Sequence, residues 1–376
     1  MSGEKERELS SLDEVPAEYR GRMLMSGIDL SEEERSGSFL QKDRNILFSR
    51  AKHLGLEVMS IDEALENREL EDYSWKAVSS DVDGYTRATE RNPTHGVFIR
   101  VKPHVKISFP VQACFFIAKE RNTQRVHNII IAEEDSELHL ITGCAVPEKM
   151  QSAVHIGITE SFVKRNAKLS FTMIHNWTSG VGVRPRTATI IEENGTFISN
   201  YICTEPVKSL QMYPTAYCVG ENAVASFQSI LYGSGRSKMD VGARAVLSAK
   251  NSRAQIISRV IATDNAEIIS RGELVGEKRD AKGHLECRGL ILSDNASILA
   301  IPELRAEEKD VELSHEAAVG KIAEEEIRYL MARGLSEDEA TSFIIKGFLS
   351  VDIKGLPPQL ASSVKRMMRM SAEKVL

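Results

Sequence analysis

The sequence predicts a mainly β protein with helical regions at both ends, built around a parallel β-helix core. Short alternating apolar stretches begin near Val97, a turn residue recurs about every 30 residues through the centre, and the hydrophobic period becomes helical after residue 311. Evenly spaced units of one turn and one strand are typical of a β-solenoid. A jelly roll or another large sandwich is the competing interpretation, because turns recur there as well.

The first 75 residues are charged and helix-prone, as in the run SIDEALE, where Ser60 or Asp62 is a candidate helix cap. We therefore expect an N-terminal helical region over residues 1–75. Residues 76–311 are expected to form the β-helix core, and residues 312–376 a C-terminal helical domain. These boundaries follow the changes in hydrophobic period along the chain.

The central repeat consists of an Asn or Asp, usually followed by a small residue and then by alternating apolar residues. Asn and Asp tolerate the left-handed backbone conformation that tight turns require, and the period-2 stretch after each one is typical of a strand. The intervals between repeats are 31, 28, 28, 29 and 44 residues. The repeat positions are Asp135, Asn166, Asn194, Asn222, Asn251 and Asn295, with Asn265 dividing the last interval.

The C-terminal segment contains signals for three helices. Gly334 stands where a first helix ends, and Ser336 with Glu339 three residues later has the spacing of a capping box for a second. Leu356 is followed by two prolines, and we expect the last helix from about Gln359. Since a solenoid exposes strand edges at its two ends, helices on both sides of the repeat are suited to cover them.

Composition and missing motifs restrict the class of protein. The net charge of −6 argues against a large nonspecific nucleic-acid surface. No apolar run reaches the roughly 20 residues of a membrane-spanning helix, and the charged N-terminus has no apolar signal core. No phosphate-binding loop, nucleophile elbow or zinc-protease helix occurs. We therefore expect a soluble, cytoplasmic protein that is not an enzyme and binds neither nucleic acid nor a membrane.

The five cysteines are spread along the chain without any Cys-x-x-Cys pair, so no zinc ribbon or ferredoxin-type motif is encoded and free thiols are expected. Cys287 lies in the strand-like run HLECRGLIL. It is either a buried apolar residue or, with Arg288 and His284 nearby, a thiolate that ligates metal. His315 precedes Glu316 at the predicted strand-to-helix junction, where a capping or surface role is the simplest interpretation.

The C-terminal block resembles the SufB/SufD family, the scaffold components of an iron–sulfur cluster assembly system. The resemblance rests on His-Glu-Ala at residues 315–317, Arg-Gly-Leu-Ser-Glu-Asp-Glu-Ala at 333–340 and Ile-Ile-Lys-Gly-Phe at 344–348, in that order. It covers roughly residues 60–370 and is strongest after residue 284. It implies that the β-helix core is right-handed.

The resemblance also implies the functional residues. In the family, a cysteine implicated in cluster assembly lies about 28 residues before the His-Glu-Ala motif, and Cys287 precedes His315 by 28 residues. Cys287 is thus expected to be the thiolate ligand or sulfur acceptor, with His315 and Glu316 as supporting metal ligands. Another family cysteine, thought to receive sulfur, has no counterpart in the matching stretch from Arg186, so the sulfur donor stays open.

The partners implied by the resemblance are a SufC-like ATPase of the ABC type, a second copy of the chain, and apo-proteins that accept the cluster. The ATPase is expected to dock on residues 322–350, with Phe343, Ile344, Ile345 and Phe348 as contacts. A homodimer places two copies of the site around a two-fold axis, where an iron–sulfur cluster is held transiently.

Two alternatives from other classes remain at this point. The main alternative is an adaptor or structural solenoid subunit of the same complex, without metal chemistry. A carbohydrate-active β-helix enzyme is the other, and it needs paired carboxylates on one face of the solenoid. Glu192, Glu193 and Glu205 are available for that role, but no spacing singles them out.

Overall fold

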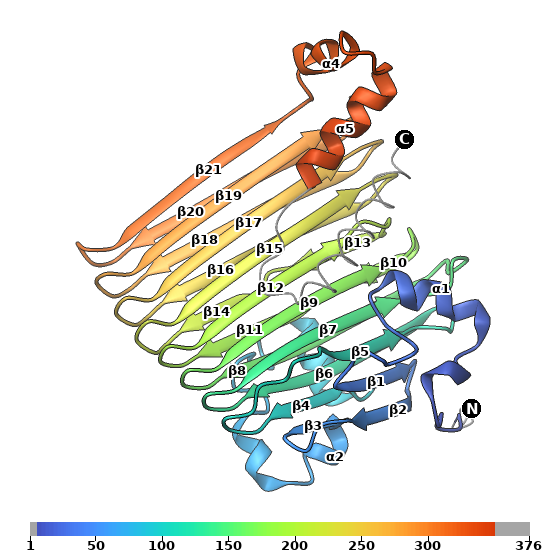
Figure 1. Ribbon diagram of the computed structural model, residues 1–376, viewed down its shortest axis with the longest axis vertical. Helices are drawn as coiled ribbons and strands as arrows, with labels where there is room; N and C mark the ends of the chain where they lie inside the picture. The colour runs from blue at the N-terminus through green and yellow to red at the C-terminus, as the bar shows by residue number, and fades with distance from the viewer. Residues whose placement is uncertain (1–5, 350–376) are drawn as a thin grey trace.

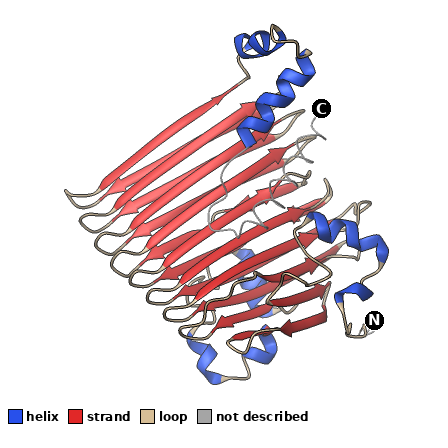
Figure 2. Cartoon of the chain, viewed as in Figure 1, coloured by secondary structure: helices blue, strands red, loops and turns tan. Residues whose placement is uncertain are grey.

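The structure is a computed structural model that describes residues 6–349 of the 376 residues, and it shows a flattened β-solenoid with helices at both ends (Figure 1, Figure 2). The solenoid has about 8 turns. In each turn the chain crosses from one sheet to the facing sheet and back, so strands of successive turns become neighbours. Parallel pairing between turns confirms the predicted solenoid and excludes a sandwich of antiparallel sheets.

Sheet A contains ten strands in the order β2-β1-β5-β7-β9-β12-β15-β17-β19-β21. Every pairing from β1–β5 onward is parallel. Its strands are β1 Gly37–Lys42, β2 Asn45–Ala51, β5 Val111–Phe116, β7 Glu137–Ala145, β9 Lys168–Asn176, β12 Thr196–Cys203, β15 Val224–Gly233, β17 Arg253–Ala262, β19 Lys282–Ile291 and β21 Glu312–Gly320.

Sheet B faces sheet A and contains eleven strands. In two turns its strand is split in two, at Pro185 and Pro214, because proline lacks the N–H that the ladder uses. Its strands are β3 Leu56–Ser60, β4 Val97–Val101, β6 Asn122–Ala132, β8 Ala153–Val163, β10 Val181–Val183, β11 Arg186–Ile191, β13 Ser209–Met212, β14 Thr215–Cys218, β16 Lys238–Leu247, β18 Glu267–Gly276 and β20 Ser297–Ala306.

The core lies between the two sheets, and strand alternation selects which residues enter it. In β16, β17 and β18 the first seven residues alternate between buried and more exposed positions. Because the pairing is parallel and in register, side chains at equivalent positions of successive turns form continuous rows. One inner row runs through Phe171, Ser199, Phe227, Ile256 and Leu285.

The predicted turn residues adopt the left-handed backbone conformation. The φ angles of Asp135, Asn166, Asn194, Asn222 and Asn251 lie between 55° and 58°. Their side chains form a ladder along one edge of the solenoid. Asn166 Nδ2 donates to Asp135 Oδ1 at 2.9 Å, and Asn194 and Asn222 each donate to the preceding turn at 3.0 Å. The ladder explains why the same residue type recurs at this interval.

The repeat continues at Asp280, not at Asn265 or Asn295 as expected. Asp280 has φ 63° and follows Asn251 by 29 residues in the same row of turns, from sheet B to sheet A. Asn265 and Asn295 lie in the other row, where the chain passes from sheet A to sheet B. Since each solenoid turn has two bends, a turn signal alone does not say which bend it marks.

The N-terminal region is only partly helical, so the expectation for residues 1–75 was wrong over residues 37–60. These form β1, β2 and β3, whose apolar side chains are largely buried; β1 extends sheet A, and β2 and β3 cover the sheet edges with antiparallel pairing. The predicted cap at Ser60 is present, because Glu63 N–H donates to its hydroxyl at 3.1 Å. The helices here are η1 Leu12–Glu14, α1 Ala17–Met25, α2 Ile61–Ala64 and η2 Arg68–Asp72, followed by α3 Gly84–Arg91 within the expected core.

A buried carboxylate fastens the segment after η2 onto sheet B. Glu160 of β8 is 0% exposed and accepts hydrogen bonds from the backbone N–H of Trp75, Ala77 and Val78 at 2.5, 2.6 and 3.0 Å. The other contact is His127 Nε2 on the neighbouring β6, at 2.8 Å. Four partners therefore replace the water that a buried carboxylate loses.

At the C-terminal end, β21 occupies residues that were expected to be helical, and the two predicted helices follow it (Figure 1). They are α4 Glu324–Met331 and α5 Glu337–Leu349. Gly334 has φ 98°, and the capping box is present, since Ser336 N–H donates to Glu339 Oε2 at 2.8 Å and Glu339 N–H donates back to Ser336 Oγ at 3.2 Å. The helix expected from Gln359 lies outside the described residues. None of the helices within residues 6–349 is long and apolar enough to cross a membrane.

Candidate functional site

Cys287 lies in the middle of β19, on the inner face of sheet A, and is 2% exposed. Its register partners are Ser258 on β17 and Ala317 on β21, so only one further turn separates it from the open end of the solenoid. Ser270 reaches it from the facing sheet, with Oγ 4.0 Å from Sγ. Cys287 is thus a core residue placed close to an accessible end.

The surroundings of Cys287 favour the neutral thiol. Burial raises its pKa and Glu286 acts in the same direction, while the Ser270 hydrogen bond and Arg259 lower it without cancelling the effect of burial. Strand alternation turns Arg288 and His284, the two residues on which the thiolate interpretation rested, to the outer face of the sheet.

On that outer face, the charges are already paired with one another. Arg288 Nε lies 2.6 Å from Glu286 Oε1, and Arg259 Nη2 lies 2.8 Å from the same oxygen. His284 Nδ1 lies 2.9 Å from Ser314 Oγ. The Arg259 contact joins β17 to β19 and the His284 contact joins β19 to β21, while the sulfur lies on the other side of the sheet.

His315 lies within β21, not at a strand-to-helix junction as expected, and its side chain is exposed. It is in register with Leu285, whereas Glu316 is in register with Glu286. Strand alternation therefore places His315 on the inner face, as it does Cys287, and Glu316 on the outer face. Within residues 6–349, no group of three or more His, Cys, Asp or Glu residues is placed to hold a metal ion. The structure brings two of the three predicted ligands to one face and separates the third from them.

The β21 edge carries a row of backbone groups without a neighbouring strand in the described part of the chain. Glu312 N–H donates to Ala281 C=O at 3.0 Å, so Glu312 and every second residue after it direct their N–H toward β19. The alternate residues between them, from Leu313 to Val319, direct N–H and C=O away from the solenoid.

On β20, the residues whose backbone groups face the open side have even numbers, whereas on β21 they have odd numbers. Ser297 N–H donates to Ala266 C=O at 2.9 Å, so residues at even positions from 298 to 306 face the open side. Pro302 occupies one of these positions and has no N–H to offer. Apolar side chains are also exposed on these two strands: Leu299 at 55%, Leu304 at 38% and Val319 at 40%.

The predicted docking residues divide between two surfaces. Ile345 is 1% exposed and, with Phe348, packs on an isoleucine row on the outer face of sheet A. Ile345 is therefore a core residue and is not available to a partner. Phe343 is 63% exposed, and with Ile344 it lines a groove of about 510 Å³ between α4 and α5. The rest of that groove is lined by Glu325, Glu326, Tyr329, Leu330 and Gly347.

A second polar cluster, which the sequence did not indicate, lies inside the first half of the solenoid. His155 Nδ1 is 3.0 Å from Gln124 Oε1 and its Nε2 is 3.9 Å from Cys144 Sγ, while His175 Nδ1 is 2.8 Å from the Tyr201 hydroxyl. Burial lowers the pKa of His155 to about 4 and that of His175 well below its ordinary value. Both imidazoles are therefore neutral at neutral pH. Strand-like sequence runs do not show which inner-facing residues meet across the two sheets.

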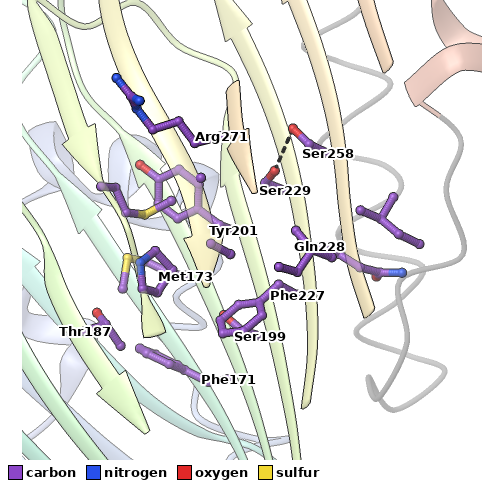
Figure 3. Close-up of a pocket in the computed structure, with 16 residues that line it drawn as sticks. Phe171, Met173, Thr187, Ser199, Tyr201, Phe227, Gln228, Ser229, Ser258 and Arg271 are labelled. Carbon is purple, nitrogen blue, oxygen red and sulfur yellow. Dashed lines mark hydrogen bonds between the residues drawn. The ribbon is translucent and has the colours of Figure 1, made fainter. Parts of the chain in front are cut away.

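A cavity of about 30 Å³ lies between the sheets in the second half of the core (Figure 3). Tyr201 and Ser229 border it, and Ser229 Oγ donates to Ser258 Oγ at 3.2 Å, the contact drawn as a dashed line. The volume suffices for about one water molecule. Aromatic and thioether side chains, including Phe171 and Met173, form much of the rest of its wall.

The fold and these residues define a β-solenoid scaffold with a buried thiol and an exposed histidine near its open end. A model of the family described as "SUF system FeS cluster assembly, SufBD core domain" matches residues 115–348. The chain therefore belongs to the SufBD family of iron–sulfur cluster assembly proteins, as the sequence resemblance indicated.

Full-length relatives support the same assignment. An "Iron-sulfur cluster assembly SufBD family protein" of Methanothermobacter thermautotrophicus is 49% identical over 375 residues, which is 98% of this chain and 91% of that protein. A protein of the same description from Archaeoglobus fulgidus is 50% identical over 356 residues, 94% and 95% of the two chains. One from Staphylococcus epidermidis is 31% identical over 374 residues, 96% and 80% of the two chains.

Proposed function

We propose that this protein is a scaffold on which an iron–sulfur cluster is assembled between two copies of the chain. The observation that carries the proposal is the position of Cys287 and His315, which share the inner face beside the uncovered end of the solenoid. Within residues 6–349 one chain brings these two predicted ligands to that face, so a second copy related by a two-fold axis completes a set of two thiols and two imidazoles.

The uncovered strand edges supply a surface for that second copy. The alternate residues of β21 from Leu313 to Val319 offer backbone donors and acceptors to an antiparallel strand, and a two-fold axis makes two identical β21 strands antiparallel across it. The exposed apolar side chains of β20 and β21 would be buried in the same contact. Pro302 interrupts the donors of β20, which favours β21 as the pairing strand.

The ligand chemistry suits a cluster that must later be released. Thiolate and imidazole both bind iron, and a mixed set holds a cluster less firmly than four thiolates. Because burial raises the pKa of Cys287, the neutral thiol is favoured in the metal-free protein, and binding of iron would displace its proton. Glu316, on the outer face, is not part of this set in our proposal.

The helices α4 and α5 are the proposed docking surface for a SufC-like ATPase of the ABC type. Phe343 and Tyr329 present exposed rings beside a groove with Glu325 and Glu326 at its border. This groove suits a partner with an apolar protrusion flanked by basic residues. The chain contains no phosphate-binding loop of its own, so ATP hydrolysis belongs to the partner.

The test is anaerobic co-expression with the SufC-like ATPase, followed by iron and sulfide analysis and absorption spectra. Cys287→Ala should lose the cluster signal while the complex still forms. Cys218→Ala is the matched control, because Cys218 is also buried but lies in β14, away from the open end. Equal iron in wild type and Cys287→Ala contradicts the proposal, and no iron in either favours the adaptor role.

A further inference from the structure

We propose that Ser270 is a positioning residue for Cys287: a chain of three serine hydroxyls ends in a hydrogen bond from Ser270 to the cysteine sulfur. The way these hydroxyls hold the thiol in the metal-free protein does not depend on the proposed function. Their effect on a bound cluster does rest on it.

The serines come from three strands, and the chain of hydroxyls that they form leads to the sulfur. Ser258 on β17 stands in the same inner row as Cys287, one turn before it, and Ser229 on β15 stands two turns before it. Ser270 belongs to β18 of the facing sheet. Its Oγ lies 3.1 Å from Ser258 Oγ and 4.0 Å from Cys287 Sγ.

The direction of these hydrogen bonds follows from the supply of protons. A hydroxyl has one proton to donate. Ser229 donates to Ser258 at 3.2 Å, so Ser258 has its own proton for Ser270. Ser270 then has its proton for the sulfur, which accepts it. All three dipoles therefore point toward Cys287, and such aligned hydrogen bonds strengthen one another.

Burial leaves these hydroxyls dependent on one another and on the sulfur for hydrogen bonds. Ser258 is 4% exposed and Ser270 is 2% exposed, so neither hydroxyl has ready access to solvent. A buried hydroxyl without a partner costs free energy, and the sulfur is the acceptor that Ser270 reaches. The same contact orients Sγ toward the interior and holds it in one rotamer. By contrast, Ser161 is equally buried on the inner face of β8, but its hydroxyl has no hydrogen-bond partner among residues 6–349.

The consequence for a cluster follows from general chemistry. A donor aimed at a ligating sulfur stabilises negative charge on it, and this raises the reduction potential of the attached cluster. Ser270 therefore has two effects on Cys287, which are measured separately: one on the orientation of the thiol, the other on the charge that the sulfur carries when it is bound.

The first experiment uses the metal-free full chain labelled with ¹³C at cysteine Cβ. Five cysteines give five NMR signals, and Cys287→Ala identifies the one that belongs to Cys287. In Ser270→Ala we expect that signal to shift and broaden as the thiol samples more than one rotamer, while the other four stay in place. Ser161→Ala should leave all five unchanged.

An unchanged Cys287 signal in Ser270→Ala, with the fold intact, overturns the inference. If Ser270→Ala does not fold, Ser258→Ala removes the donor one step back and should shift the same signal to a smaller extent. If Ser258→Ala folds and leaves the signal in place, the chain of hydroxyls does not orient the thiol.

The second experiment uses the reconstituted cluster and tests the dependence on the proposed function. We expect a lower reduction potential in Ser270→Ala than in wild type, with equal iron content. An equal potential contradicts the electronic effect. If wild type binds no cluster while the NMR signal still responds to Ser270→Ala, the proposed function fails and the positioning of the thiol stands.

Discussion

His315 and Cys287 lie on neighbouring strands and on the same face of sheet A, but His315 is in register with Leu285, two residues before the cysteine. A strand spacing of about 4.8 Å and a rise of about 3.3 Å per residue place their Cα atoms about 8 Å apart. A thiol and an imidazole on these two residues can both reach one ligand across this separation, whether it is a single metal ion or an iron–sulfur cluster.

The orientation of backbone groups along β21 predicts opposite effects for proline at two adjacent positions. Ala317→Pro removes an N–H that faces the open edge, so the chain should fold but pair poorly with a second copy. Ala318→Pro removes an N–H used in the β19 ladder and should disrupt the last turn instead. Mass measurement in solution would show monomers for Ala317→Pro and dimers for wild type. A wild-type monomer, even with its ATPase bound, would contradict the dimer.

Phe343 and Ile345 lie two residues apart on α5 and should respond differently to a charge. Phe343→Asp alters an exposed ring, so we expect loss of co-purification with the ATPase and little change in the free energy of unfolding. Ile345→Asp places a carboxylate against the isoleucine row and should lower the free energy of unfolding by several kcal/mol. If the complex survives Phe343→Asp, the groove between α4 and α5 is not the docking surface.

Glu160→Gln should destabilise the protein by about 3 kcal/mol, because the amide cannot accept all the hydrogen bonds that the buried carboxylate accepts. Urea unfolding gives the change in free energy. Glu267→Gln is the control: Glu267 is exposed and pairs with Lys238 at 3.2 Å on the surface, so its loss should change stability by only about 0.5 kcal/mol. Protease cleavage within residues 73–83 of Glu160→Gln would show that the carboxylate fastens this segment.

The buried His155 predicts acid sensitivity. Its pKa is about 4 in the folded protein, below the ordinary value of 6.5, because burial disfavours the charged imidazole. Between these values the unfolded chain binds more protons than the folded chain, so stability falls as pH is lowered from 6.5 toward 4. The decrease in the free energy of unfolding that His155 causes between pH 6.5 and pH 4 should reach about 3 kcal/mol. His155→Gln should lose less stability than wild type across that range, whereas His104→Gln, at an exposed site, should follow wild type.

The solenoid was predictable because its turns leave a signal at single residues. The left-handed turn at Asn194, for example, favours Asn or Asp, and the side chain of Asn194 also donates a hydrogen bond to Asn166 in the turn before it. The strands over residues 37–60 were missed because they follow a highly charged, helix-prone segment and were grouped with it. The position of β1 is decided by its pairing with β5, and that of β3 by its pairing with β4, and no local pattern encodes either contact.

The site was predictable only in part. The spacing between Cys287 and His315 is a property of the sequence, and parallel pairing converts it into a shared face. Sequence could not show that Ser270 lies against the sulfur, because that contact joins two different sheets. Nor could it show that Glu316 points away, since the expected helix would have placed it differently from the strand that forms.

Because the turns of the solenoid are regular, their number sets the length of the molecule along the solenoid axis. Each turn adds about 4.8 Å along the axis, and each contacts mainly its neighbours. The number of turns therefore sets how far α4 and α5 stand from the N-terminal strands that close the other end (Figure 1). A change of one turn would alter the distance between the two ends of the solenoid while leaving the strands on either side of Cys287 as they are.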